Sequence, residues 1–168
     1  MKIILIGFMG SGKSSVTAAL SRLLNLPMLE MDDLVYRKTN TKTMHEVFNK
    51  GGELLLRETE IAIAKEYALA DNIVVSTGAG VVLNKIVLDY LKQQNGKIFC
   101  LNASFEVLAD RLAGDASRPL FKDVMQAKSL YELRQPLYLG YADEVVNVWK
   151  KSVEEIAHEI LQSHTGSA

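Results

Sequence analysis

The fold of this chain is decided by the stretch Ile3-Ile4-Leu5-Ile6-Gly7-Phe8-Met9-Gly10-Ser11-Gly12-Lys13-Ser14. Its first four residues are apolar and predict a buried β-strand. The segment after them has the spacing G-x-x-x-x-G-K-[ST] and leads into a helical pattern. A glycine-rich loop between a strand and a helix points its backbone N–H groups at phosphate oxygens, and the helix N-terminus adds the positive end of its dipole. The stretch therefore predicts a site for nucleotide phosphates.

The side chains of this loop have separate expected roles. We expect the ammonium group of Lys13 to reach the β- and γ-phosphates of ATP, and the hydroxyl of Ser14 to bind Mg²⁺. ATP and Mg²⁺ are therefore the expected cofactors. The residues predicted to surround the phosphates are Gly10, Ser11, Gly12, Lys13, Ser14 and Ser15.

Short apolar runs alternate with longer helical patterns along the rest of the chain. Strands are predicted at Ile3–Ile6, Met28–Met31, Ile73–Ser76, Lys97–Leu101 and Val145–Val148. Helices are predicted at Lys13–Leu24, Met44–Ala68, Leu83–Gln93, Ser104–Leu112, Val124–Tyr141 and Ser152–Leu161. Several strands are apolar throughout, which is typical of a parallel sheet covered on both faces. The pattern predicts one α/β domain with a central five-stranded parallel sheet, helices on both faces, and ligands at the carboxyl ends of the strands.

The composition is that of an ordinary globular domain. The chain has 168 residues, of which 48% are hydrophobic and 23% charged, and its net charge is −1. This balance gives no electrostatic reason to expect nucleic acid or an anionic membrane surface as a partner. No apolar stretch approaches the ~20 residues that span a bilayer. We expect one domain over residues 1–163, a flexible tail over residues 164–168, a cytoplasmic location and a monomer.

Two single residues have structural interpretations. The one cysteine, Cys100, excludes an intrachain disulfide and a multi-cysteine metal site, and its apolar neighbours predict a buried strand position. Trp149 closes the last predicted strand, and we expect it to be a packing residue.

The classes of nucleotide-binding protein are narrowed by missing motifs. A GTPase needs the guanine-binding sequence N-K-x-D, and neither Asn49-Lys50 nor Asn84-Lys85 is followed by Asp at the required place. A motor ATPase usually has an acidic residue at the end of a second apolar strand, whereas Ile73-Val74-Val75-Ser76 is followed by Thr77-Gly78. Small-molecule kinases remain.

Several motifs over residues 3–142 resemble the shikimate kinase family. The phosphate loop is close to the family's consensus sequence, and Glu30-Met31-Asp32 stands where the family has Asp-x-Asp. The other matching segments are Glu46-Val47-Phe48, Gly52-Glu53, Arg57-Glu58-Thr59-Glu60, Thr77-Gly78-Ala79-Gly80, Arg118-Pro119-Leu120 and Arg134-Gln135-Pro136-Leu137-Tyr138. Glu30, Leu56 and Ala79 depart from the family's Asp, Phe and Gly. The resemblance implies a nucleoside-monophosphate-kinase-like fold and transfer of the ATP γ-phosphate to the 3-hydroxyl of shikimate, a step of aromatic amino acid biosynthesis.

The resemblance also implies roles on the acceptor side. A carboxylate is best held by paired guanidinium groups, for which Arg57 and Arg134 are the candidates. Asp32 can orient the attacking hydroxyl and take its proton, while Glu30 would hold Mg²⁺ through water. The segment Gly78-Ala79-Gly80 would offer backbone N–H groups to the acceptor, provided that Ala79 adopts a negative φ.

Two further arginines are assigned to the nucleotide. A turn-rich segment at about 112–123 is predicted to be a mobile lid, and its Arg118 would fold over the ATP phosphates and neutralise charge on the transferred group. Arg111 precedes this segment and is expected to lie on the adenine face.

Three alternatives stay open. Counting back from Arg57 instead of forward from Lys13 places Asp33, not Asp32, on the family's second aspartate. A gluconate-type or other polyol-acid kinase has the same scaffold, and Ala79 and Glu30 do not exclude it. A nucleotide-binding protein without turnover would be expected to lack Lys13, Asp32 or Arg118, and all three are present.

Overall fold

The computed structural model describes residues 1–113 and 123–165 of the chain. The strands are β1 (Lys2–Ile6), β2 (Met28–Glu30), β3 (Ile73–Ser76), β4 (Gly96–Asn102) and β5 (Glu144–Asn147). The helices are α1 (Lys13–Leu24), α2 (Met31–Thr39), α3 (Met44–Glu66), α4 (Lys85–Lys92), α5 (Phe105–Leu112), α6 (Val124–Tyr141) and α7 (Val153–Thr165), with a 3-10 turn η1 (Val81–Leu83).

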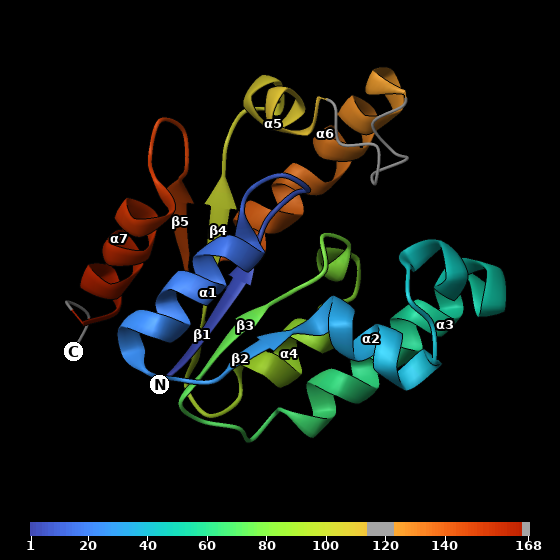
Figure 1. Ribbon diagram of the computed structural model, residues 1–168, viewed down its shortest axis with the longest axis horizontal. Coiled ribbons are helices and arrows are strands. Elements are labelled where there is room, and N and C mark those ends of the chain that lie inside the picture. Colours follow the sequence, from blue (N-terminus) through green and yellow to red (C-terminus); the bar gives the residue numbers. More distant parts are fainter. Residues whose placement is uncertain (114–122, 166–168) are drawn as a thin grey trace.

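The strands form one parallel sheet in the order β2-β3-β1-β4-β5. All residues of β1 are buried, because this strand lies in the middle and helices cover both faces. α1 and α7 pack together against one face, and α4 and α6 lie against the other (Figure 1). The predicted fold class is therefore confirmed.

The sheet brings three segments together. Ser76 at the end of β3 pairs with Leu5 of β1 on one side and with Glu30 of β2 on the other. Because the strands are parallel, the segments that follow β1, β2 and β3 leave the sheet at the same edge. These segments contain the glycine-rich stretch, the acidic pair Asp32-Asp33 at the start of α2, and Gly78-Ala79-Gly80.

The helix α2 was not predicted. The sequence pattern extended the second strand to Met31, whereas β2 ends at Glu30 and Met31 begins the helix. Asp32 and Asp33 lie in the first turn, Arg37 and Lys38 lie in the last turn, and all four charges favour the helix dipole. The helix ends where Asn40 takes a left-handed conformation with φ 52°. The sequence thus contained signals for both ends of this helix. Nine residues are too few, however, to show the helical periodicity of apolar residues clearly.

The long helix α3 is broken, which the continuous pattern from Met44 to Ala68 did not predict. Gly51 and Gly52 have non-helical backbone angles, and Gly52 combines φ 67° with ψ −164°. Residues with a side chain rarely adopt this combination of backbone angles, so glycine is needed at position 52. The break separates a short first segment from the segment that carries Arg57.

The C-terminal part differs from expectation in two places. Trp149 was predicted to pack in the core, but 55% of it is exposed. α7 continues to Thr165, so His164 lies in the helix. Cys100 is buried, as predicted. Within residues 1–113 and 123–165, no helix is both long enough and apolar enough to cross a membrane.

Lys2 is fully buried at the start of β1. Its Nζ donates hydrogen bonds to the carbonyls of Tyr67 (3.2 Å), Ala68 (2.7 Å) and Gln93 (3.0 Å). These carbonyls follow the last turns of α3 and α4, where helix carbonyls have no partner within the helix and a positive charge is favourable. Lys2 therefore attaches the ends of two helices to the central strand.

The substitution Lys2→Met is expected to lower the free energy of unfolding by about 2–4 kcal/mol, because buried carbonyls lose their donor. Urea denaturation measures the loss. The matched control is Lys38→Met, which removes an exposed ammonium group that pairs with Glu66, and its expected loss is under about 1 kcal/mol. Equal losses in the two variants would contradict the role given to Lys2.

Candidate active site

The phosphate loop, residues 7–14, joins β1 to α1 through glycines with positive φ. Gly7, Gly10 and Gly12 have φ of 151°, 80° and 94°, respectively, and Gly12 is the N-cap of α1. A Cβ on Gly10 would lie 2.8 Å from Cδ1 of Leu112, so a side chain there would collide with α5. The N-terminus of α1 thus opens into a glycine-lined loop, which is the geometry of an anion site.

The side chains of the phosphate loop differ in burial and in hydrogen bonding. Lys13 Nζ stays within the loop, where it donates to the carbonyls of Gly7 (2.8 Å) and Phe8 (3.3 Å). Ser14 and Ser15 are exposed at the start of α1. The Ser11 hydroxyl is buried and, within the described part of the chain, has no hydrogen-bond partner. The structure brings the predicted loop residues together at the carboxyl edge of the sheet.

The segment Gly78-Ala79-Gly80, here called the 78–80 loop, fits tightly against two other segments. A Cβ on Gly78 would lie 2.9 Å from Asp32 Oδ1 and 3.3 Å from Glu60 Oε1. A Cβ on Gly80 would lie 2.5 Å from Nη2 of Arg57. Asp32, Arg57 and the 78–80 loop therefore meet in one place, as predicted.

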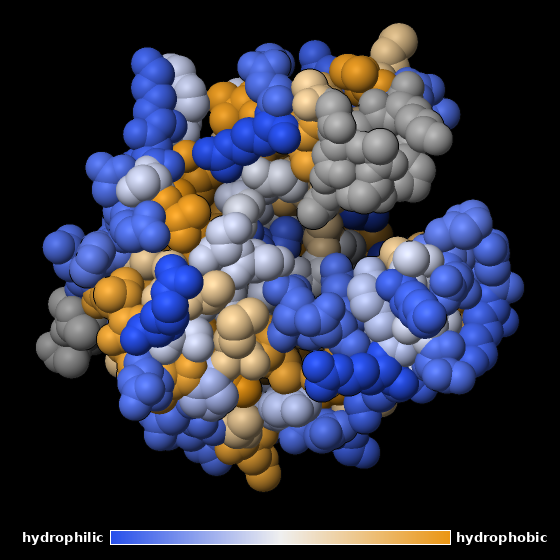
Figure 2. Space-filling model, viewed as in Figure 1, coloured by the Kyte–Doolittle hydropathy of each residue, from blue (hydrophilic) through white to orange (hydrophobic). Residues whose placement is uncertain are grey.

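The two aspartates after β2 differ in their surroundings. Asp32 is half-buried and faces Gly78, whereas Asp33 is exposed. Ala79 is not among the residues with positive φ, so its methyl group meets no backbone strain where the family has glycine. The face drawn in Figure 2 is hollowed beside α2 and α3, the two helices that carry Asp32 and Arg57.

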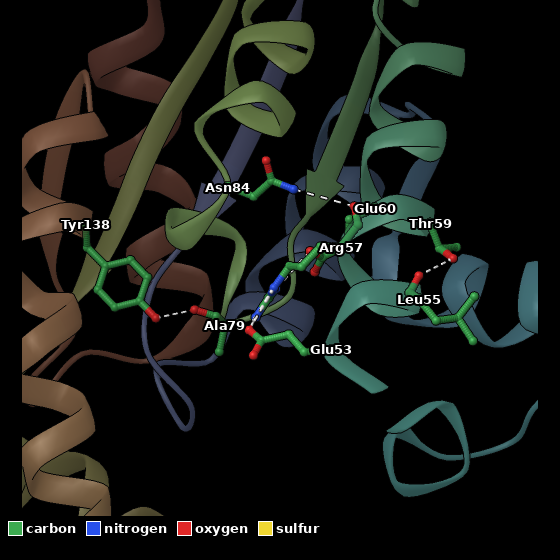
Figure 3. A network of polar contacts seen from close by, with 8 residues as sticks. All are labelled: Glu53, Leu55, Arg57, Thr59, Glu60, Ala79, Asn84 and Tyr138. Atoms are coloured by element: carbon green, nitrogen blue, oxygen red, sulfur yellow. Dashed lines mark hydrogen bonds and ion pairs between the residues drawn. The ribbon is translucent and has the colours of Figure 1, made fainter. Parts of the chain in front are cut away.

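Arg57 is held between two carboxylates on its own helix (Figure 3). Its Nη1 donates to Glu60 at 2.8 Å, while Nη2 and Nε donate to Glu53 at 3.1 and 3.3 Å. Burial acts to lower the pKa of Arg57, but the carboxylates of Glu60 and Glu53 outweigh it and raise that pKa. Burial also raises the pKa of Glu60, and the Arg57 guanidinium opposes that shift. Arg57 is therefore cationic and fixed in orientation.

Arg134 approaches the same place from α6. Burial raises the pKa of the Tyr138 phenol, and the charges of Arg134 and Arg57 oppose that shift. The Nε of Arg134 is buried and has no hydrogen-bond partner among the described residues. The Tyr138 hydroxyl donates to the Ala79 carbonyl (Figure 3). The two predicted carboxylate-binding arginines therefore both lie near the Tyr138 phenol.

Glu30 ends β2, and its carboxyl group lies near Ser14 of the phosphate loop and Ser76 of β3. Burial raises the pKa of its carboxyl group, the nearby hydroxyls of Ser14 and Ser76 lower it, and the charge of Asp32 raises it further. Glu30 Oε2 and Ser76 Oγ are buried without a hydrogen-bond partner in the described part of the chain. Hydroxyl and carboxylate oxygens are suitable ligands for Mg²⁺ and its water shell. The described residues contain no group of three or more His, Cys, Asp or Glu that could hold a metal, so phosphate oxygens would have to complete the shell.

Arg111 bridges the phosphate loop and the end of β5. Its Nη1 donates to the Gly10 carbonyl at 3.3 Å and its Nη2 to the Val148 carbonyl at 3.0 Å. The guanidinium thus borders the phosphate loop, and its contact with adenine stays a prediction. Arg118 lies outside the described residues, as does most of the predicted lid.

Two site residues were not singled out from the sequence. Glu60 is 2% exposed and pairs with Arg57, and Tyr138 is fully buried and bonds to Ala79. Both stand inside the quoted motifs, three residues after Arg57 and four after Arg134. Helical spacing of i, i+3 and i, i+4 places side chains on one face, so this spacing was the available signal.

The comparisons with known proteins agree with this geometry. A family model described as shikimate kinase matches residues 9–165. Shikimate kinase from Aquifex aeolicus is 37% identical over 169 residues, covering 100% of this chain and 98% of the relative. The structure of shikimate kinase from Acinetobacter baumannii in complex with shikimate superposes with a TM-score of 0.89 at 29% identity, covering 99% of this chain and 93% of that one.

A solved gluconokinase from Sinorhizobium meliloti is also similar, with a TM-score of 0.63 at 18% identity, covering 99% of this chain and 93% of that chain. This likeness shows the fold alone. The family match spans most of the chain, and the sequence relative is similar over its full length. The chain belongs to the shikimate kinase family of P-loop kinases.

Proposed function

We propose that this kinase transfers the γ-phosphoryl group of ATP to the 3-hydroxyl of shikimate and releases shikimate 3-phosphate and ADP. The observation that carries the proposal is the meeting of Asp32, Arg57 and the 78–80 loop beside the phosphate loop. Shikimate has hydroxyl groups and one carboxylate. A carboxylate that accepts a hydroxyl proton and a guanidinium that binds a carboxylate are the two groups that such an acceptor needs.

Arg57 and Arg134 hold the carboxylate of the acceptor. Three of the five N–H groups of Arg57 donate to Glu53 and Glu60, so the same guanidinium has further donors for a bidentate contact. The buried Nε of Arg134 is a second donor that lacks a partner among the described residues. Backbone N–H groups of Gly78, Ala79 and Gly80 bind the ring hydroxyls.

Asp32 orients the 3-hydroxyl and takes its proton as the oxygen attacks. The new bond joins this oxygen to the γ-phosphorus, and the bond from that phosphorus to the β,γ-bridging oxygen breaks in line, with ADP as the leaving group. No covalent enzyme intermediate is required.

The phosphate loop binds the nucleotide. Backbone N–H groups of residues 10–15 and the ammonium group of Lys13 hold the β- and γ-phosphates, and Arg111 lies on the adenine face. Ser14 binds Mg²⁺ directly and Glu30 through water; when bound, this ion neutralises charge on the phosphate oxygens. Arg118, which is outside the described residues, neutralises the charge that develops on the transferred group. We also propose that the enzyme acts as a monomer, in the cytoplasm.

The neighbouring pair Asp32 and Asp33 gives a direct test of the proposal. We expect Asp32→Asn to lower kcat for shikimate by about 10²–10³-fold, because an amide cannot take the hydroxyl proton. The exposed Asp33 lies one residue further along α2, and Asp33→Asn is expected to stay within about twofold of the wild type. A coupled assay of ADP release with and without shikimate measures both. Release of ADP by the wild type that does not depend on shikimate would refute the assignment of the acceptor, and equal losses in the two variants would refute the role of Asp32.

Gly80 tests the fit between the 78–80 loop and Arg57. In Gly80→Ala the new methyl group falls 2.5 Å from Arg57 Nη2 and displaces the guanidinium. We expect the KM for shikimate to rise at least about tenfold while the KM for ATP stays unchanged, since the lost carboxylate contact is charge-assisted.

The matched control is Gly140→Ala on α6, where a Cβ meets no atom of the described chain within 4 Å. This variant is expected to keep both KM values and to gain up to about 1 kcal/mol of stability, because alanine favours a helix over glycine. A rise in both KM values for Gly80→Ala, or an equal rise in the control, would show that the loop does not set the acceptor site.

A further inference from the structure

The 78–80 loop is held from two sides. On one side Asp32, Glu60 and Arg57 leave no space for a side chain on either glycine. On the other side the hydroxyl of Tyr138 donates a hydrogen bond to the Ala79 carbonyl, at the middle of the loop (Figure 3). Tyr138 is fully buried, so water does not compete for this bond. The position of the loop is therefore set by close packing in front and by one directional bond behind.

Tyr138 also lies near the second arginine. It follows Arg134 by four residues on α6, so both side chains leave the same face of the helix. The charges of Arg134 and Arg57 both act on the phenol and oppose the rise in its pKa that burial causes. One hydroxyl group thus bonds to the 78–80 loop and lies near both arginines.

The hydroxyl, and not the ring, makes these contacts. A phenylalanine would fill the same space in the core, since the two side chains differ only in the oxygen atom. A packing role alone therefore gives no reason for a phenol at this position. The hydrogen bond of the oxygen leads to the 78–80 loop, which binds the acceptor in the proposed reaction.

We propose that Tyr138 is a positioning residue for the acceptor, which holds the 78–80 loop in place through its hydroxyl group. The inference rests on the proposed function. The Tyr138 hydroxyl bonds to the 78–80 loop, so we expect it to act on binding of the hydroxylated carboxylate and not on the chemical step.

The test is Tyr138→Phe, with Tyr131→Phe as a matched control. Tyr131 lies on the same helix, and its hydroxyl donates to the carbonyl of Ala103 at 2.8 Å, outside the 78–80 loop. Each variant loses one hydrogen bond from a tyrosine to a backbone carbonyl and keeps its aromatic ring. Tyr131 is half-buried whereas Tyr138 is fully buried, so thermal unfolding measures the general loss of stability in each variant.

For Tyr138→Phe we expect the KM for shikimate and the Kd for shikimate measured by calorimetry to rise about tenfold, the value of one buried hydrogen bond. The kcat and the KM for ATP should stay within about twofold. For Tyr131→Phe the Kd for shikimate should match the wild type.

The inference is overturned if Tyr138→Phe binds shikimate as the wild type does, if its KM for ATP rises as much as its KM for shikimate, or if the control shows the same rise. In each of these cases the wild type still phosphorylates shikimate, and the proposed function stands. If the wild type neither binds nor phosphorylates shikimate, the proposed function falls, and the role of Tyr138 falls with it.

Discussion

The segment directly after β3 is closely packed, and the arrangement of the acceptor site depends on this packing. Gly78 lies against Asp32 and Glu60, and Gly80 lies against the guanidinium of Arg57, so closely that a methyl group on either glycine would displace these side chains. This close packing fixes the start of α2, the loop after β3 and the helix α3 relative to one another. The parallel sheet then sets that arrangement beside the phosphate loop, since all its strands end at the same edge.

The ion pair beside the 78–80 loop is a consequence of this packing. A buried carboxylate such as Glu60 is strongly unfavourable unless it is paired, and Arg57 is the partner that its helix provides three residues away. The ion pair in turn fixes the guanidinium, so little side-chain entropy remains to be lost when a ligand carboxylate binds. Glu53 completes the arrangement from the exposed side. The same residues therefore stabilise the fold and prepare the acceptor site.

Most of the fold could be predicted because the apolar runs and the glycine-rich loop have strong local signals. The strands and the phosphate loop follow directly from residues 3–14 and from the later apolar runs. α2 and the break at Gly51-Gly52 could not be predicted, because a nine-residue helix has a weak period and an isolated Gly-Gly pair is compatible with a bent helix. The acceptor residues were predicted from motifs. Their contacts were not, because Glu60 and Tyr138 act through partners that only the folded chain brings near.

The claim on which the others depend is that Asp32 and Arg57 bind opposite ends of one acceptor. A crystal structure of the enzyme with shikimate and ADP measures this directly. We expect the 3-hydroxyl within about 3 Å of an Asp32 carboxylate oxygen, and the shikimate carboxylate in contact with the guanidinium groups of Arg57 and Arg134. A 3-hydroxyl that contacts Asp33, or a carboxylate that lies away from both arginines, would contradict the claim.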